Sequence, residues 1–385
     1  MGLYFIDSLS KYLSYLKYII RSKKKWVFPK KTKIIILDEH GSDRIIDLVL
    51  GHDECEVFED RKETLNVPIF LLSLFNYHRY GRYTYRATYI KYTGAKHALT
   101  YIDTRVFYSD LFTLIPNCKL ILIQNGTRRS TWWYPLAKDR KYDIDYYFTH
   151  CMEWSKFASN YVNANFFEIG HIAANKFKKS KFIKANKIQW ISNWRIYDTY
   201  KWNDKVISWK VYYEACKTCL EPINEYCLNN NIDFEIIGTS LINGDKELEF
   251  YNSIINNFKF VPRSNIYSSH EKLENNAIIC GIDSTLLYEA FGRGFRTAFF
   301  SIRAHYLNDF SLNFAAPKKN IEDFGLFWCN KPDKGHYLKI INYLFNVNEM
   351  DWKEQLIKYK NCTMDHNYGN TIIKDALRKE GVRID

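Results

Sequence analysis

Between residues 33 and 170 the chain alternates short apolar runs with segments whose apolar residues recur every three or four positions. The runs at residues 33–38, 97–103 and 120–124 lack the two-residue alternation of a half-exposed strand. Strands that are apolar on both faces are typical of a parallel sheet covered by helices on each side. We therefore predict a doubly wound, Rossmann-like α/β domain over residues 32–180.

The same alternation restarts after a basic, weakly periodic segment at residues 172–186. Apolar strands are predicted at residues 188–192, 234–238 and 278–282, each followed by a helical pattern. This favours a second Rossmann-like domain over residues 181–345. Two doubly wound domains in succession face each other across a central cleft, where the carboxyl ends of their strands bind ligands.

The two ends of the chain fall outside this pattern. Residues 1–31 are predicted to form a basic amphipathic helix, because apolar residues recur at helical spacing and eight Lys and Arg against one Asp give a charge of +7. Such a helix suits an anionic membrane surface, and packing on the protein itself is the alternative. Residues 346–385 are predicted to form a helical tail.

The composition narrows the class of partner. The 385 residues carry a net charge of +12, which favours an anionic ligand, membrane or nucleic acid. Nucleic acid is excluded because no recognised binding motif is present. There is no run of 18 apolar residues, and nine cysteines without framework spacing favour a reducing compartment. We expect a cytoplasmic protein, with residues 1–31 able to hold it at the inner face of the plasma membrane.

Cofactor motifs are missing from the sequence. There is no G-x-G-x-x-G, no Walker A motif and no zinc spacing, so we expect no NAD, no ATP, no metal ion and no other cofactor. Asp143 and Asp145 match the D-x-D pattern of some metal sites. They enter a predicted strand far in sequence from any partner cluster, and we interpret them as structural.

The sharpest motif is D-S-T-L-L-Y-E-A, which begins directly after the apolar run A-I-I-C-G-I. Ser284 or Thr285 is expected to cap the helix that follows, so that backbone N–H groups and the positive helix end face the cleft and suit a phosphate. Glu289 lies one turn further along and could reach a ribose hydroxyl. The structural alternative is a capped helix whose acids face solvent.

Other polar residues of the second domain follow its predicted strands. Ser192-Asn193 follows the first strand, and Gly238-Thr239 follows the second. His270 precedes the strand of the D-S-T motif and could stabilise a departing phosphate. The predicted ligand-binding residues of this domain are Ser192, Asn193, Gly238, Thr239, His270, Asp283, Ser284, Thr285 and Glu289.

Strand ends of the first domain supply a second set of candidates. A general base that deprotonates a hydroxyl is expected among Glu39, His40 and Asp103, although Asp103 could instead cap a helix. The remaining candidates are expected on the side of a second substrate, with a tight turn as the alternative for Asn-Gly. They are Gln124, Asn125, Gly126 and His171.

The D-S-T-x-x-Y-E-A block, followed by G-R-G-F-R-T-A-F-F, resembles the donor-site block of bacterial GT-B glycosyltransferases, including teichoic-acid polymerases and capsule transferases. The segments K-I-I-I-L-D-E-H-G-S, H-A-L-T-Y-I-D and L-I-L-I-Q-N-G-T-R are similar to surface-carbohydrate biosynthesis proteins. The resemblance covers most of residues 33–330. It implies a GT-B fold, with a nucleotide-activated donor in the second domain and an acceptor in the first.

We therefore predict a glycosyltransferase of the metal-independent GT-B type. It would move a sugar from a nucleotide-activated donor to a bacterial surface polysaccharide, such as capsule or lipopolysaccharide, or to a lipid-linked glycan. Three alternatives stay open: a CDP-polyol phosphotransferase of the teichoic-acid type, a non-hydrolysing nucleotide-sugar epimerase, and a non-catalytic binding protein of the same fold. Donor turnover without an acceptor separates the epimerase from the transferases.

Overall fold

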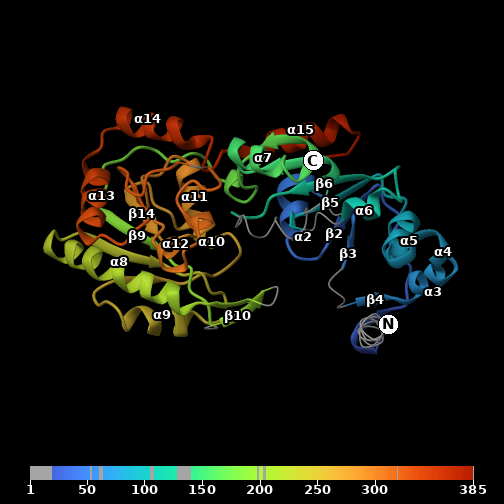
Figure 1. The fold of residues 1–385 in the computed structure, drawn as a ribbon, viewed down its shortest axis with the longest axis horizontal. Coiled ribbons are helices and arrows are strands. Elements are labelled where there is room, and N and C mark those ends of the chain that lie inside the picture. The colour runs from blue at the N-terminus through green and yellow to red at the C-terminus, as the bar shows by residue number, and fades with distance from the viewer. Residues whose placement is uncertain are drawn as a thin grey trace.

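The computed structural model describes residues 20–52, 54–59, 64–104, 108–127, 140–196, 199–202, 205–318 and 320–384. It has two lobes, each built on a parallel sheet with helices packed against it (Figure 1). The predicted pair of doubly wound α/β domains is confirmed. No helix of the described residues is long and apolar enough to span a membrane.

The first sheet has the strand order β3-β2-β5-β6-β7-β8, and all its neighbouring strands are parallel. The order reverses between β2 and β5, which makes this the switch point of the domain. The strands are β2 (Ile34–Leu37), β3 (Glu56–Phe58), β5 (His97–Thr100), β6 (Lys119–Ile123), β7 (Tyr142–Thr149) and β8 (Val162–Glu168). The helical segments between them are α2 (Ser42–Ile45), η1 (Ile46–Leu50), α3 (Val67–Phe75), α4 (Tyr77–Tyr80), η2 (Gly81–Tyr83), α5 (Thr84–Thr93), α6 (Tyr108–Phe112) and α7 (Met152–Ala158).

The second sheet has the order β13-β12-β9-β14-β15-β16, again parallel throughout. In chain order this is the 3-2-1-4-5-6 arrangement of dinucleotide-binding domains, with its switch point between β9 and β14. The strands are β9 (Lys187–Ile191), β12 (Asp233–Ile237), β13 (Lys259–Val261), β14 (Ala277–Gly281), β15 (Thr297–Phe300) and β16 (Trp328–Cys329). The helical segments are α8 (Lys210–Asn229), α9 (Gly244–Asn252), α10 (Ser268–Glu271), α11 (Thr285–Gly292), α12 (Arg303–Leu307), η5 (Phe310–Leu312) and α13 (Lys334–Asn346).

Two short pairs of strands lie outside these sheets. β10 (Thr199–Trp202) pairs antiparallel with β11 (Lys205–Ser208), and β1 (Lys23–Lys25) pairs parallel with β4 (Thr64–Asn66). β1 corrects the prediction of a helix that continues to residue 31, because its backbone bonds to β4 instead of to itself. The predicted amphipathic stripe falls mainly on residues 1–19, which lie outside the described residues.

The C-terminal tail is divided between the two lobes. α14 (Glu349–Lys360) packs on the second domain, whereas η6 (Tyr368–Asn370) and α15 (Thr371–Lys379) pack on the first (Figure 1). The crossing is fixed by buried polar contacts at η4 (Ala174–Lys176), where Asn175 Nδ2 donates to Asn370 Oδ1 at 2.8 Å. Residues 346–385 therefore do not form a separate unit, because the apolar face of each helix is buried against a different lobe.

We expect the Trp352→Ala variant to lower the free energy of unfolding of the second domain by about 3–5 kcal/mol. Trp352 is 1% exposed, its ring lies against Phe291 and Phe327, and its Nε1 donates to the Gly294 carbonyl at 3.0 Å. Urea unfolding measures the change. Met350→Ala, on the same helix but 81% exposed, is the control and should change stability by less than about 0.5 kcal/mol. Equal effects of the two variants would contradict this packing.

Candidate functional site

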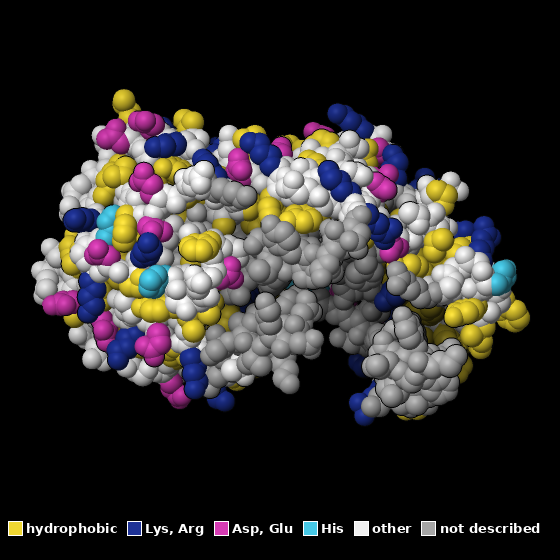
Figure 2. Space-filling model, viewed as in Figure 1, with side chains coloured by type: hydrophobic (Ala, Val, Ile, Leu, Met, Phe, Trp, Pro, Cys, Tyr) yellow, Lys and Arg dark blue, Asp and Glu magenta, His cyan; other side chains and the backbone are white. Residues whose placement is uncertain are grey.

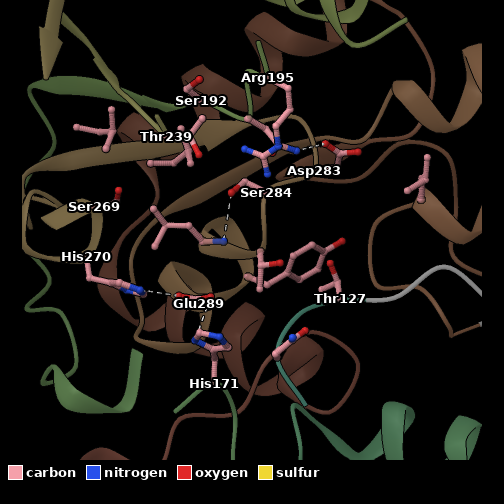
Figure 3. Close-up of a pocket in the computed structure, with 18 of the residues that line it drawn as sticks. Thr127, His171, Ser192, Arg195, Thr239, Ser269, His270, Asp283, Ser284 and Glu289 are labelled. Carbon is pink, nitrogen blue, oxygen red and sulfur yellow. Dashed lines mark hydrogen bonds and ion pairs between the residues drawn. The ribbon is translucent and has the colours of Figure 1, made fainter. Parts of the chain in front are cut away.

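A cavity of about 450 Å³ lies between the two lobes, at the carboxyl ends of both sheets (Figure 3). Arg44, Asn125, Thr127, Trp154 and His171 line it from the first domain, and the second domain supplies most of the remaining wall. All nine ligand-binding residues predicted in the second domain line this cavity: Ser192, Asn193, Gly238, Thr239, His270, Asp283, Ser284, Thr285 and Glu289. These residues are far apart in sequence, and the parallel sheet brings them together because they follow neighbouring strands.

The switch point of the second sheet explains why these residues meet. β9 and β14 are hydrogen-bonded neighbours whose outer partners lie on opposite sides, so the loops after them diverge and leave a crevice. Ser192 and Asn193 follow β9, while Asp283 and Ser284 follow β14. Ser284 caps α11, and its Oγ accepts from the Leu286 N–H at 3.3 Å, as predicted. The first turn of α11 therefore lines the cavity with the positive end of the helix.

Glu247 of α9, which sequence reasoning missed, fixes two of the loops from behind. Its fully buried carboxylate accepts from the Thr239 and Ser240 backbone N–H groups, each at 2.9 Å, and from the Ser192 hydroxyl. Gly238 packs closely against Glu247 and Phe260, because a Cβ at this position would lie 3.3 Å from Glu247 Oε2 and 2.9 Å from the Phe260 ring. An acid one turn into the helix that follows a Gly-Thr-Ser loop was the available signal. Ser192 thus has a positioning contact in addition to its place in the wall.

A buried chain of polar side chains crosses the floor of the cavity from one domain to the other. The Tyr101 hydroxyl lies 2.6 Å from His171 Nε2, and His171 Nδ1 lies 3.2 Å from Glu289 Oε1. The other Glu289 oxygen lies 3.1 Å from His270 Nε2 (Figure 3). Tyr101 and His171 belong to the first domain, and Glu289 and His270 to the second. The chain therefore forms only when the two lobes come together.

Burial sets the protonation of this chain. It raises the pKa of Glu289 from its usual 4.5 to about 8, although the charges of Arg44, Arg293 and Arg263 act in the opposite direction. Burial also lowers the pKa of His270 well below 6.5, with the His171 imidazole next in effect. At neutral pH Glu289 thus carries a proton and His270 is uncharged.

These protonation states fix the direction of the hydrogen bonds. At these N···O distances a protonated Glu289 can direct its proton toward His270 Nε2 and offer its other oxygen to His171 Nδ1, which leaves His171 Nε2 to accept from the Tyr101 hydroxyl. The proton of His270 then resides on Nδ1, which has no hydrogen-bond partner among the described residues. The arrangement is an ordered chain that can move protons between its two ends.

Four arginines surround the same cavity. Arg44 comes from α2, Arg195 from the loop after β9, Arg263 from the loop after β13, and Arg303 from α12. Burial lowers the pKa of Arg263, and the charges of Arg44 and Arg195 lower it further. Mutual repulsion of cations that line one cavity indicates a site for an anion.

Arg303 is the most enclosed of the four arginines. It is buried, its guanidinium lies 4.7 Å from the Trp209 ring centroid, and its Nη2 pairs with Asp283 Oδ2 at 2.8 Å. Asp283 also accepts from Asn193 Nδ2 at 3.1 Å. Arg303 Nε and Nη1 have no hydrogen-bond partner among the described residues. Arg303 lines the cavity, and a guanidinium with two such buried donors is suited to oxygen atoms of a ligand.

A family model assigned to O-antigen biosynthesis matches residues 121–381. This range is more than half of the chain and includes β9, β14 and the first turn of α11. The chain belongs to this family. No curated protein matches it by sequence.

Solved structures similar to this chain have the GT-B fold. One, assigned as a UDP-N-acetylglucosamine 2-epimerase from Listeria monocytogenes, has a TM-score of 0.51 at 12% identity, and the match covers 92% of this chain and 98% of that one. Another, the wall teichoic acid polymerase TagF soaked with CDPG, has a TM-score of 0.50 at 13% identity over 91% of this chain and 89% of that one. This protein is therefore a GT-B-type member of a surface-carbohydrate biosynthesis family.

The three predicted bases do not line the cavity. The positive φ of Asp38, whose carboxylate accepts from the His40 N–H at 3.0 Å, turns the chain, and Glu39 and His40 are exposed. Asp103 is fully buried and accepts from the Tyr147 hydroxyl at 3.0 Å, within the domain core. The geometry corrects their placement at the cavity, since tight turns after β2 and β5 direct them elsewhere.

The residues predicted on the acceptor side divide in two. Asn125 and His171 line the cavity, but Gln124 and Gly126 do not. The buried Gln124 amide holds the turn, because its Nε2 donates to the Gly126 carbonyl at 3.0 Å and its Oε1 accepts from the His150 N–H at 2.9 Å. Asn-Gly therefore forms a tight turn held by Gln124, which was the structural alternative to a substrate-binding role.

A metal ion has one conceivable place among the described residues. One nitrogen each of His171 and His270 and one oxygen of Glu289 lie within 4.8 Å of one another. The charges of Arg44, Arg293 and Arg263 all act on the Glu289 carboxyl. Three guanidinium groups around one carboxyl repel a divalent cation. The arrangement favours protons over a metal ion here.

Proposed function

We propose that this protein is a glycosyltransferase that uses a nucleotide-activated sugar and acts on a surface polysaccharide or its lipid-linked precursor. The observation that carries the proposal is the arginine-lined cavity at the first turn of α11. Among the residues lining the cavity, the only acids are Asp283, which pairs with Arg303, and Glu289, which is protonated at neutral pH. The net positive charge suits a nucleoside diphosphate.

In this proposal Ser284, Thr285 and the backbone at the start of α11 bind the donor phosphates, and Arg303 directs Nε and Nη1 at the same group. Arg263 is fixed toward the cavity because its three nitrogens donate to the carbonyls of Asn265, Thr239 and Ile266, each within 3.2 Å. Cations fixed in advance stabilise the charge that develops on a leaving diphosphate. The predicted ribose contact of Glu289 stays a prediction, and its place in the proton chain gives it a second role.

The chain Tyr101–His171–Glu289–His270 supplies the proton transfer. Transfer of a sugar requires the acceptor hydroxyl to lose a proton and the leaving phosphate to gain charge. His171, which lines the cavity from the acceptor domain, takes up the hydroxyl proton at Nε2 in place of its contact with Tyr101, and its Nδ1 proton passes through Glu289 to His270. His270 then donates its Nδ1 proton to the leaving phosphate. Protons balance, because one enters the chain and one leaves it.

The rival functions make different demands on this site. A CDP-polyol phosphotransferase would use the same anion cavity, since its donor is also a nucleoside diphosphate. An epimerase is favoured by one observation, that the proton chain is enclosed and can remove and return a proton without a second substrate. Incubation of the protein with donor alone distinguishes the epimerase from both transferases. Conversion of the donor sugar without acceptor would overturn the transferase proposal.

Loss of the α11 hydroxyls should weaken donor binding. A charge-assisted hydrogen bond contributes about 1.5–3 kcal/mol, so Ser284→Ala/Thr285→Ala should raise the donor Kd by roughly tenfold to a hundredfold. Thermal shift across UDP-, GDP-, CMP- and CDP-linked sugars identifies the donor, and calorimetric titration measures the affinity. Ser311→Ala, another hydroxyl that lines the cavity but is not on α11, is the matched control. Unchanged affinity in a folded double variant would place the donor elsewhere.

The acceptor and the location belong to the same proposal. A polysaccharide or lipid-linked acceptor would approach from the first domain, past Asn125 and His171. The protein would work in the cytoplasm, and the basic segment 1–31 would hold it at the anionic inner face of the plasma membrane. The first 19 residues of that segment lie outside the described residues.

A further inference from the structure

The first domain carries a group of exposed apolar side chains far from the cavity. They lie on α3, at the start of α4 and just after β1, and in Figure 2 hydrophobic side chains gather over α3 and α4 beside basic ones. Phe75 and Val27 are each 79% exposed, and Trp26 is 72% exposed. We call this group the α3 face. It consists of Trp26, Val27, Phe28, Leu71, Leu72, Leu74, Phe75 and Tyr77.

The two segments of the α3 face are held together by the fold. β1 ends at Lys25 opposite Asn66, the last residue of β4, so the residues that follow each strand start side by side. Asn66 Nδ2 donates to the Val27 carbonyl at 2.9 Å, and its Oδ1 caps α3 by accepting from the Ile69 N–H at 3.1 Å. One buried asparagine therefore fixes the apolar turn after β1 against the start of α3.

The two segments that carry the α3 face contain charges of one sign. Residues 20–31 contain six Lys and Arg, residues 64–96 contain five, and neither segment contains Asp or Glu. Eleven cations in these two segments compare with a net charge of +12 for the whole chain. Lys25 pairs with Glu59 at 2.6 Å, while Lys23, Arg79 and Lys91 are exposed. The exposed aromatic and aliphatic side chains of the α3 face therefore lie on segments whose charged side chains are all Lys or Arg.

We propose that the α3 face docks onto a bilayer that contains anionic lipid. Large apolar side chains that are exposed together mark an interaction site, and their insertion into the interface removes them from water. Lysines and arginines beside them gain from the negative surface potential of the bilayer. Nucleic acid would match the charge, but it gives no reason to expose four leucine and phenylalanine side chains on one short helix. This inference does not depend on which reaction the cavity catalyses.

Vesicle co-sedimentation of the full-length protein tests the proposal. The wild type should bind vesicles with 30% phosphatidylglycerol at least tenfold more tightly than pure phosphatidylcholine vesicles, and binding should weaken at high salt. The Leu71→Ser/Leu74→Ser/Phe75→Ser variant should bind the anionic vesicles at least tenfold more weakly. Met350→Ser/Ile357→Ser, equally exposed on α14 of the other domain, should bind like the wild type.

A charge variant and a truncation complete the test. Lys23→Glu/Lys24→Glu should weaken binding to anionic vesicles at low salt, whereas Lys184→Glu/Lys217→Glu, exposed on the second domain, should not. A protein lacking residues 1–19 should keep part of the binding, and that part should disappear with the α3 substitutions. Binding that depends on residues 1–19 alone would overturn the proposal. So would a dimer that the α3 substitutions disrupt without any change in vesicle binding.

Discussion

The Glu289→Gln variant is expected to transfer sugar about 10²- to 10⁴-fold more slowly than the wild type, the range for loss of a general acid–base group. Glutamine can donate to His270 and accept from His171, as the protonated carboxyl does, but it cannot release a proton. Folding and donor affinity should therefore change little. A transfer assay and a donor titration on the same preparation separate these quantities. Glu271→Gln, exposed on α10, is the control and should behave like the wild type.

Stability against pH gives a second reading of the same variant. The pKa of Glu289 in the folded protein, about 8, is above its usual 4.5, so the folded state keeps a proton that the unfolded chain releases. The wild type should thus lose stability as the pH rises from 4.5 through 8, and Glu289→Gln should lose less. Thermal unfolding between pH 5 and pH 9 measures the difference. Parallel curves, or a wild-type transfer rate at every pH, would show that Glu289 serves only as a structural hydrogen-bonding group.

The Arg303→Met variant is expected to raise the donor Kd by about 10²- to 10⁴-fold. The variant would lose two charge-assisted hydrogen bonds to the donor, from Nε and Nη1, and each contributes about 1.5–3 kcal/mol to binding. The protein should also become less stable by about 3–5 kcal/mol, because Asp283 would be left as a buried charge without its partner. Calorimetry and urea unfolding measure the two effects.

Two further variants separate binding from stability. Arg303→Met/Asp283→Asn removes both charges, so stability should recover while donor binding stays weak. Arg296→Met is the matched control, since this arginine is equally buried and lies against Phe182 on the outer side of the domain. It should destabilise the protein without weakening donor binding. Recovery of donor affinity in the Arg303→Met/Asp283→Asn variant would contradict a direct contact between Arg303 and the donor.

The sequence by itself determined the two parallel sheets and the residues that follow the strands of the second domain at the cavity. Strands buried on both faces leave a continuous apolar run, and the residue after such a run lies at the carboxyl edge of the sheet. Asn193, Thr239 and Ser284 could be placed by this rule alone. The cap on α11 was readable because capping depends on adjacent residues.

The base candidates lie away from the cavity because the same rule meets a tight turn. Glu39 and Asp103 follow strands, but the direction of a side chain after the strand depends on local dihedral angles, such as the positive φ of Asp38. The sequence pattern carries no record of these angles. Arg44 and Arg303 do not follow strands and reach the cavity from helices. From the sequence alone, a charged residue in a short helix is predicted to face solvent.

Only the tertiary structure joined His171 to Glu289 and His270. His171 belongs to the first domain and lies about 100 positions or more before His270 and Glu289, which belong to the second. Burial sets the pKa of Glu289 and of His270, and burial of a side chain at an interface depends on how the two lobes meet. The split of the C-terminal tail and the joining of residues 20–31 to α3 were decided in the same way. Local pattern thus determined each sheet and its edge, and long-range packing determined which edges, helices and termini share one surface.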